Sequence, residues 1–144
     1  MEAHTVLVVD DEPASLRALR RTLAGSYSVV CAENGDAAVG ILAERPVSVL
    51  VTDHRMPGMA GSELVALCRT SYAETVRIVL TGYADLASIL DAINRGEVFA
   101  YLTKPWEPHD LLLTVRRGVE RLDAQRERSR LHSELEAACE HAES

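Results

Sequence analysis

The sequence has few of the residues that mark disulfide-rich, zinc-binding or membrane proteins. Its 144 residues include only three cysteines, Cys31, Cys68 and Cys139, and none of them forms a CxxC pair. This odd number and spacing argue against a disulfide framework or zinc site and favour buried or incidental thiols in a reducing compartment. No run approaches the ~18 apolar residues of a membrane span, and the start, MEAHTVL, lacks a signal-peptide pattern. We therefore expect a cytoplasmic protein without membrane contact.

Positive charge is also scarce in this chain. Its 15 lysines and arginines stand against 22 aspartates and glutamates, which gives a net charge of −7 and a pI near 5.2. A self-sufficient nucleic-acid binder would instead show a clustered basic face, so we expect no direct contact with nucleic acid. The composition, 47% hydrophobic and 26% charged, is ordinary for one globular domain with a short appendage.

Five strand-like runs alternate with stretches of helical spacing. The runs cover 5–9, 27–31, 47–51, 77–80 and 99–102. Leu16, Leu19 and Leu23 follow helical spacing, and Pro13 and Gly25 suit the two ends of that helix. Similar patterns predict helices around 37–42, 64–68, 86–93 and 112–122. Parallel strands need crossover connections, so the alternation predicts an α/β fold with helices on both faces of a parallel sheet.

Polar and charged residues follow most of the predicted strands. In a parallel α/β sheet, functional groups gather outside the carboxyl ends of the strands. The second run is followed only by Glu33 and Asn34. The other four predicted strands are followed by residues with functional side chains: Asp10 and Asp11 after the first strand, Asp53 after the third, Thr81 after the fourth and Lys104 after the fifth. We therefore expect one site of three carboxylates, a hydroxyl and an ammonium group.

These residue types indicate metal-assisted phosphoryl chemistry. Three close carboxylates repel one another, and hard oxygen ligands favour Mg²⁺, or Mn²⁺ in its place, over zinc. A carboxylate beside such a metal can attack a phosphoryl group and form an aspartyl phosphate. The metal and Lys104 would neutralise charge, while Thr81 would donate to a phosphoryl oxygen.

The chain resembles the receiver domain of two-component response regulators. Four motifs carry the resemblance in chain order: VLVVDDEP, LVTDHRMPGMAG, VLTGYAD and YLTKPW. It covers about residues 4–122 and implies a flavodoxin-like, doubly wound sheet of five parallel strands in the order 2-1-3-4-5. It further implies a phosphorylation-dependent signalling protein whose partner is a histidine kinase or a phosphotransfer protein.

The resemblance assigns roles to the residues at the strand ends. Asp53 would accept the phosphoryl group in a Mg²⁺-dependent reaction, Asp10 and Asp11 would hold the metal together with Asp53, and Lys104 would contact the phosphate. Such a domain catalyses its own phosphorylation and dephosphorylation but turns over no external substrate, so its status as an enzyme is left open.

Further residues bear on switching and on the lifetime of the phosphate. Thr81 and Tyr101 would form the switch that alters the interaction surface, and Lys104–Pro105 would be a cis peptide. Arg55 and Tyr83, two residues after Asp53 and Thr81, would flank the path of the attacking water. Both are bulky, and Arg55 can hold a phosphoryl oxygen, so a long-lived phosphate is expected.

Several of these residues also have purely structural explanations. Asp11 or Glu12 can cap the first helix, and Tyr101 can be a fixed core aromatic. Trp106 is expected to pack at the start of the last helix. His54 is expected to face solvent from its loop, without binding a metal or relaying a phosphoryl group from the donor.

Two other classes of function compete with the receiver. A phosphatase of the haloacid-dehalogenase kind also uses an aspartate nucleophile, Mg²⁺, a threonine and a lysine. It needs a second aspartate two residues after the first, however, and Arg55 occupies that position. An interaction module that ignores phosphorylation would keep the fold and use the acidic edge passively, which the complete set of five site residues disfavours.

The chain departs from the family pattern in two places. Ala60 stands where many receivers carry an aspartate, and we expect this to affect the cap of the third helix. The segment RGEVFAYL lacks the acidic run of the winged-helix transcription-factor subgroup. This weakens the expectation of a homodimer through the face made by the fourth helix, fifth strand and fifth helix.

The last part of the chain is polar and free of glycine and proline. We expect residues 1–122 to form the receiver domain and 123–144 to be a helical extension or linker towards an output domain not contained in this sequence. Leu131, Leu135, Ala138 and Ala142 follow 4-3-4 spacing, but the interval from Leu122 to Leu131 breaks the heptad register. A coiled coil needs three or four sustained heptads, so homodimerisation through this helix stays open.

Overall fold

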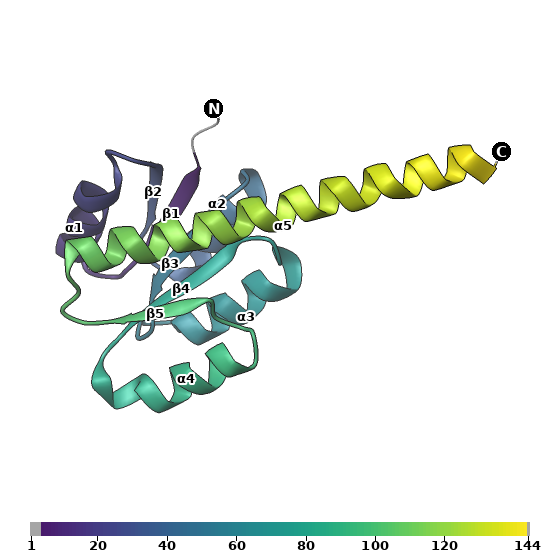
Figure 1. The fold of residues 1–144 in the computed structure, drawn as a ribbon. Coiled ribbons are helices and arrows are strands. Elements are labelled where there is room, and N and C mark those ends of the chain that lie inside the picture. The colour runs from purple at the N-terminus through teal and green to yellow at the C-terminus, as the bar shows by residue number, and fades with distance from the viewer. Residues whose placement is uncertain (1–3, 144) are drawn as a thin grey trace.

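The computed structural model describes residues 4–143, which form five strands, five α-helices and one 3₁₀ turn (Figure 1). The strands are β1 (Thr5–Val9), β2 (Ser28–Ala32), β3 (Val49–Asp53), β4 (Val76–Thr81) and β5 (Ala100–Thr103). The helices are α1 (Pro13–Leu23), α2 (Gly35–Glu44), α3 (Gly61–Ser71), α4 (Leu86–Asn94) and α5 (Pro108–Glu143), with the turn η1 (Tyr83–Asp85) before α4.

The strands form one parallel sheet in the order β2-β1-β3-β4-β5, which confirms the predicted flavodoxin-like topology. The register pairs Val9 with Ala32 and with Thr52, and Thr81 with Thr103. The carboxyl ends of the strands therefore meet at one edge of the sheet. The strand order reverses between β1 and β3, where α/β sheets place their ligand sites.

Helices cover both faces of the sheet, because the buried strands are apolar on both sides. On one face, alternate residues of the central strands pack with α1 and α5 through Leu19, Leu23, Leu111 and Val115. On the other face, the intervening residues pack with α2, α3 and α4 through residues such as Leu64. Each strand thus contributes to two cores and holds its carboxyl end in a fixed position.

The structure differs from the sequence prediction at some element ends. β3 begins at Val49 and includes Asp53 as its last residue, so this carboxylate belongs to the strand itself. The packed stripe of α5 runs through Leu111, which is fully buried, whereas Leu112 is only partly buried beside it. In α4, which lies in the helical segment predicted around 86–93, Ile89 is buried and Leu90 is 43% exposed, because this short helix turns only a narrow face to the sheet.

Helix α5 continues well beyond the body of the domain (Figure 1). Just past the buried Leu122, two side-chain contacts flank it: Nε2 of His4 lies 3.3 Å from Oδ1 of Asp123, and Arg126 pairs with Glu74 at 3.8 Å. The predicted helical extension is therefore present and continuous with the last helix. No helix between residues 4 and 143 is long and apolar enough to cross a membrane.

The projecting part of α5 carries an exposed apolar stripe. Leu131 and Leu135 are 51% and 64% exposed, and Ala138 is also exposed. The nine residues from Leu122 to Leu131 correspond to about two and a half helical turns. The stripe therefore lies on the side of α5 opposite its packed face. The side chain of Ala142, the fourth member of the predicted pattern, lies outside the described residues.

At the amino edge of the sheet, Arg77 of β4 forms hydrogen bonds with two loops. Its guanidinium donates to the carbonyl oxygens of Ala73, Thr75, Gly96 and Glu97, at 2.7 Å for the contact of Nε with Glu97. These carbonyls belong to the loops that follow α3 and α4. The arginine therefore satisfies backbone groups that these loops leave without helical or sheet partners.

The three cysteines are free thiols. Cys68 is buried, Cys31 is half-buried and Cys139 is exposed on α5. This agrees with the expectation of buried or incidental thiols.

Candidate functional site

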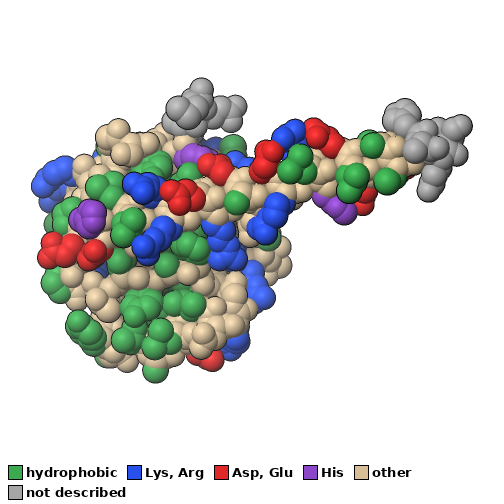
Figure 2. Space-filling view, in the orientation of Figure 1, with side chains coloured by type: hydrophobic (Ala, Val, Ile, Leu, Met, Phe, Trp, Pro, Cys, Tyr) green, Lys and Arg blue, Asp and Glu red, His purple; other side chains and the backbone are tan. Residues whose placement is uncertain are grey.

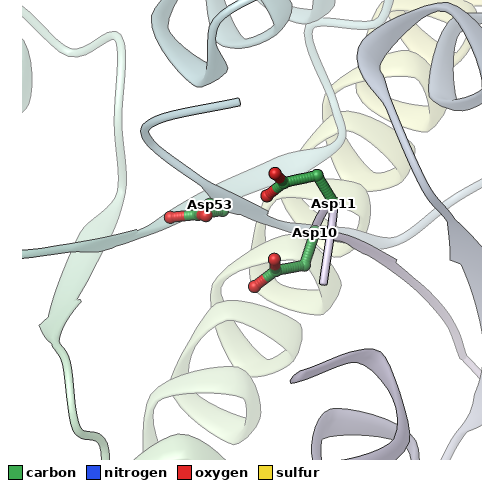
Figure 3. Close-up of side chains that lie close together, drawn as sticks. All are labelled: Asp10, Asp11 and Asp53. Carbon is green, nitrogen blue, oxygen red and sulfur yellow. The ribbon is translucent and has the colours of Figure 1, made fainter. Parts of the chain in front are cut away.

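Three carboxylates meet at the carboxyl edge of the sheet, at the neighbouring ends of β1 and β3 (Figure 3). Asp10 directly follows β1 and is fully buried, Asp53 ends β3 and is 9% exposed, and Asp11 is exposed beside them. One carboxylate oxygen from each lies within 4.8 Å of the others. The structure thus brings together the three acids that the sequence placed at strand ends.

One ammonium group faces two of these carboxylates. Nζ of Lys104 lies 3.1 Å from Oδ1 of Asp53 and 3.3 Å from Oδ2 of Asp10. The backbone N–H of Lys104 donates to the carbonyl oxygen of Thr81 at 2.9 Å, which anchors the end of β5 against β4. The next peptide bond, Lys104–Pro105, is cis, as predicted. Three negative groups near one positive group leave the site negative.

Burial disfavours the charged form of the Asp53 carboxyl group. Burial raises the pKa of Asp53 above the ordinary value of 3.8, the hydrogen bond and charge of Lys104 lower it in part, and Asp10 raises it further. Burial alone would lower the pKa of Lys104, but the hydrogen bonds and charges of Asp53 and Asp10 outweigh burial and raise it. The carboxylates are therefore only partly neutralised by the protein itself.

The acids after β1 do not cap α1. Glu12 occupies the N-cap position, but its side chain makes no capping hydrogen bond. Oδ1 of Asp10 instead accepts from the backbone N–H of Glu12 at 3.0 Å, while Oδ2 faces Lys104. The capping role that the sequence left open for Asp11 and Glu12 is therefore not found at this described helix end.

The backbone of Asp53 is held closely by the start of α3. The N–H of Gly61 donates to the carbonyl oxygen of His54 at 2.9 Å, and a Cβ atom at Gly61 would clash with the carbonyl oxygen of Asp53. Only glycine permits this approach of two backbones. Ala60, at the N-cap position of α3, supplies no side-chain hydrogen bond, as expected from its departure from the family pattern.

Thr81 and Tyr101 lie on the same face of the sheet. Thr81 ends β4, is almost fully buried and donates to the carbonyl oxygen of Gly82 at 3.1 Å. The register pairs Val79 with Tyr101 and Thr81 with Thr103, and residues two apart in a strand point to one side. Tyr101 is half-buried and packs with the cluster between the sheet, α3 and α4. The proposed switch pair is therefore arranged along one face.

Arg55 has a partner that the sequence did not indicate. Its Nε and Nη2 donate to the two carboxylate oxygens of Asp85 at 2.6 and 2.8 Å. The Arg55 guanidinium lowers the pKa of Asp85, and Asp85 raises the pKa of Arg55. Tyr83, in the same turn as Asp85, is 76% exposed. Arg55 and Asp85 lie 30 residues apart in irregular segments, so no periodicity in the sequence pointed to this pair.

His54 is not the solvent-facing residue that the sequence suggested. It lines a cavity of about 140 Å³ between α3 and α4 together with Ser62 and Ser88, and its Nδ1 is buried with no hydrogen-bond partner among residues 4–143. The backbone N–H of His54 donates to the carbonyl oxygen of Leu80 at 2.9 Å. Pairing with β4 thus continues one residue past Asp53, which turns the two side chains to opposite sides. Trp106 packs against the core formed with α1 and α5, as expected.

The carboxylate cluster has the chemistry of a divalent-cation site. It offers only oxygen ligands, and in the described part of the chain Lys104 supplies the ammonium group that balances the buried Asp10 and Asp53. Oxygen ligands of this kind suit Mg²⁺ or Mn²⁺. A cation bound there would relieve the repulsion that Lys104 leaves, so the donor set fits the metal expected from the sequence.

Comparison with known proteins places these features in a family context. A family model described as the response regulator receiver domain matches residues 6–116. The hydrogenase transcriptional regulatory protein HoxA of Cupriavidus necator is 44% identical over 131 residues, which cover 91% of this chain and 27% of that protein. The chain therefore spans about a quarter of the length of this curated relative.

Solved structures share the fold over nearly all of the chain. The receiver domain of an HD domain-containing protein from Pseudomonas fluorescens Pf-5 is 36% identical, with a TM-score of 0.82 over 89% of this chain and 95% of that one. A structure described as adenylate cyclase from Rhodopirellula baltica is 32% identical, with a TM-score of 0.87 over 92% and 98%.

Proposed function

The chain belongs to the response regulator receiver family, and from this premise we propose that it is a Mg²⁺-dependent phosphorylation switch with Asp53 as acceptor. Its phosphodonor would be the phosphohistidine of a histidine kinase or of a phosphotransfer protein. The observation that carries the proposal is the cluster of Asp10, Asp11 and Asp53 with Lys104 3.1 Å from Asp53. We expect the reaction to take place in the cytoplasm.

Asp10, Asp11 and Asp53 would hold the metal, Mg²⁺ or in its place Mn²⁺. When bound, the ion supplies charge neutralisation for the phosphoryl oxygens. Within the protein, the hydrogen bond from the N–H of Glu12 orients Asp10, and the close contact with Gly61 fixes the backbone of Asp53. These contacts hold the donor set in place before any ligand arrives, which lowers the cost of reorganisation during transfer.

In the transfer step, a carboxylate oxygen of Asp53 forms a bond to phosphorus while the P–N bond of the donor phosphohistidine breaks. The electron pair of that bond returns to the imidazole. Lys104 then moves its ammonium group from the carboxylates towards the phosphoryl oxygens, where the charge has increased. Hydrolysis reverses the state, with water attacking phosphorus and the Asp53 carboxylate leaving. The domain therefore acts on its own phosphate and not on an external substrate.

The decisive experiment is intact-protein mass after treatment with a small-molecule phosphodonor and Mg²⁺. Wild type is expected to gain one phosphoryl group, and Asp53→Asn is expected to gain none. Glu33→Gln is a matched control, because Glu33 is an exposed acid that follows β2 at the same edge of the sheet. It should be labelled like wild type. Labelling of Asp53→Asn, or full labelling in the presence of a chelator, would contradict the assignment.

Thr81 and Tyr101 would couple the phosphate to the interaction surface. A hydrogen bond from the Thr81 hydroxyl to the charged phosphoryl group is worth ~1.5–3 kcal/mol, whereas moving a population from 1:99 to 99:1 needs ~5.5 kcal/mol. Thr81 alone is therefore insufficient, and Lys104 and the metal supply the rest. In the labelling experiment, Thr81→Ala should still accept phosphate but show a weakened structural response.

Two surfaces are candidates for contact with partners. Figure 2 shows hydrophobic side chains gathered over α4 and β5, where Leu90 is exposed. The second is the apolar stripe of Leu131 and Leu135 on α5. Either would support a homodimer, and size-exclusion chromatography with light scattering before and after phosphorylation would show whether one forms.

The relation of this chain to longer relatives bears on its output. We propose that residues 1–122 are the receiver unit and that the helix from 123 onwards connects it to further domains, since the chain covers only 27% of HoxA. Any action on transcription would come from such domains, because the receiver itself has no role in binding nucleic acid in this scheme.

A further inference from the structure

One ion pair bridges the two loops that flank the acceptor. Arg55, in the loop after β3, binds both oxygens of Asp85, in the η1 turn after β4. The Arg55 side chain is 75% exposed and that of Asp85 is 17% exposed. The arginine is therefore free to turn towards solvent, whereas the aspartate is held in the turn.

Arg55 stands close to a second anion in the phosphorylated protein. It lies two residues after Asp53, so their Cα atoms are at most about 7 Å apart. A phosphoryl group on Asp53 brings about −1.5 to −2 charges and three acceptor oxygens. A guanidinium group binds phosphate with the same two-pronged geometry that it uses for carboxylate. Asp85 and the phosphate would therefore compete for one guanidinium.

Asp85 does not serve as a helix cap. It occupies the N-cap position of α4, but its side chain makes no capping hydrogen bond, with φ −105° and ψ 4°. Aspartate is among the best N-cap residues because its carboxylate accepts from the first backbone N–H groups of a helix. Asp85, however, is the last residue of η1 and lacks the extended backbone typical of a capping residue, and the backbone N–H of Leu86 already donates to the carbonyl oxygen of Tyr83. The carboxylate of Asp85 is therefore committed to Arg55 and not to the start of α4.

We propose that Arg55 exchanges Asp85 for the phosphoryl group when Asp53 is phosphorylated, and that Asp85 is a positioning residue for Arg55. The exchange rests on the proposed function, since it requires the phosphate on Asp53. It connects the acceptor with η1 and α4 independently of Thr81. It also affects the lifetime of the phosphate, because Arg55 cannot stabilise the phosphoryl group while it is paired with Asp85. The larger the fraction of molecules with the Arg55–Asp85 pair, the faster the phosphate is lost.

The test is the rate of dephosphorylation, followed by intact mass after the phosphodonor is removed. Asp85→Asn keeps the size of the side chain but loses the charge that holds Arg55, and its phosphate should persist about two- to fivefold longer, the size expected from one exposed ion pair. Arg55→Gln should shorten the lifetime by a similar factor. In the double variant, Asp85→Asn should add nothing to the effect of Arg55→Gln, because its effect acts only through the arginine.

Asp91→Asn is the matched control. Asp91 is an exposed acid of α4 that pairs with Arg95 at 3.4 Å, so its replacement removes the same charge from the same helix without touching Arg55. It should leave the lifetime unchanged.

Hydrogen exchange of the η1 segment gives a second measurement. Without phosphate, Arg55→Gln and Asp85→Asn should both exchange faster there than wild type. On phosphorylation, the wild-type segment should approach their rate.

The outcomes separate the two proposals. No mass gain in wild type would overturn the proposed function and the exchange with it. Normal labelling with an unchanged or shorter lifetime in Asp85→Asn would overturn the exchange alone. So would a lengthening of equal size in the Arg55→Gln background, because the effect of Asp85 would then not pass through Arg55.

Discussion

The amino and carboxyl edges of the sheet differ in how far their polar and charged groups are paired. At the amino edge, Arg77 donates to four backbone carbonyl groups, and the buried Thr75 hydroxyl donates to the carbonyl oxygen of Val47 at 2.8 Å. At the carboxyl edge, Asp10, Asp11 and Asp53 lie close together, and the ammonium group of Lys104 contacts Asp10 and Asp53. The same strands thus end in satisfied groups on one side and in surplus negative charge on the other.

This contrast separates stability from function. Buried polar groups that are fully paired stabilise a fold, whereas unpaired or like-charged groups cost free energy and persist where a ligand uses them. We therefore expect substitutions at the amino edge to lower stability and leave phosphorylation intact. Substitutions at the carboxyl edge should impair phosphorylation without lowering stability. Three measurements test this division, in order of expected effect.

The largest effect is expected at Arg77. Arg77→Met keeps the apolar part of the side chain but removes all four hydrogen bonds. It should lower the free energy of unfolding by about 3 kcal/mol, since hydrogen bonds from a charged donor contribute ~1.5–3 kcal/mol each and the exposed ones less. Urea unfolding measures the change, and labelling of Asp53 should stay normal at low temperature.

Arg69→Met is the matched control at the same edge. Arg69 is exposed and its pair with Glu97 is long, at 3.5 Å, so its loss should change stability by less than about 0.5 kcal/mol. Equal effects of the two substitutions, or loss of labelling in Arg77→Met, would abolish the proposed division between the edges.

The second measurement is the stabilisation of the fold by Mg²⁺, which would supply positive charge to the carboxylate cluster. Mg²⁺ at 100 times its dissociation constant should stabilise the wild-type fold by about 2.7 kcal/mol, because it binds only the folded carboxylate cluster. Asp11→Asn should lose most of this gain without unfolding, since Asp11 is exposed. Glu33→Gln should keep it. Thermal unfolding with and without Mg²⁺ provides the data, and a gain retained in Asp11→Asn would remove Asp11 from the metal site.

The smallest effect is expected for the free energy of unfolding of the metal-free protein when Asp53, the proposed acceptor, is replaced. Because burial raises the pKa of Asp53 in the fold, its ionised form destabilises the protein at pH values above that raised pKa. Asp53→Asn should therefore stabilise the metal-free protein at pH 7, by on the order of 1 kcal/mol. The gain should shrink as pH falls through the raised pKa and vanish below the unfolded value of 3.8. A gain that does not depend on pH between 7 and 3.5, measured in a chelator, would assign it to packing instead of charge.

The carboxyl edge was predictable from sequence because strand ends carry its residues. A parallel sheet brings its carboxyl ends to one edge, so Asp10, Asp53 and Lys104 were located once the strands were identified. The resemblance then supplied the strand order. The helical extension followed from a segment free of glycine and proline, which offers no point of interruption.

The contacts of loop residues were not predictable in the same way. The Arg55–Asp85 pair joins two irregular segments, where no period relates sequence position to direction. The burial of His54 depends on pairing that extends one residue past β3. Arg77 is a lone arginine in an apolar strand, and its carbonyl partners are backbone groups that exist in every sequence. Such features become visible only when the loops have a defined path.

The two side-chain contacts at the base of the α5 projection give this helix the properties of a lever. Asp123 with His4 and Arg126 with Glu74 hold it at the margin of the domain. The 17 residues from 127 to 143 then extend for about 25 Å at 1.5 Å per residue. By the same dimensions, a tilt of about 5° at this fulcrum moves the far end by about 2 Å. A displacement too small to alter the core would thus be mechanically amplified along the helix to a distance that can make or break a packed contact.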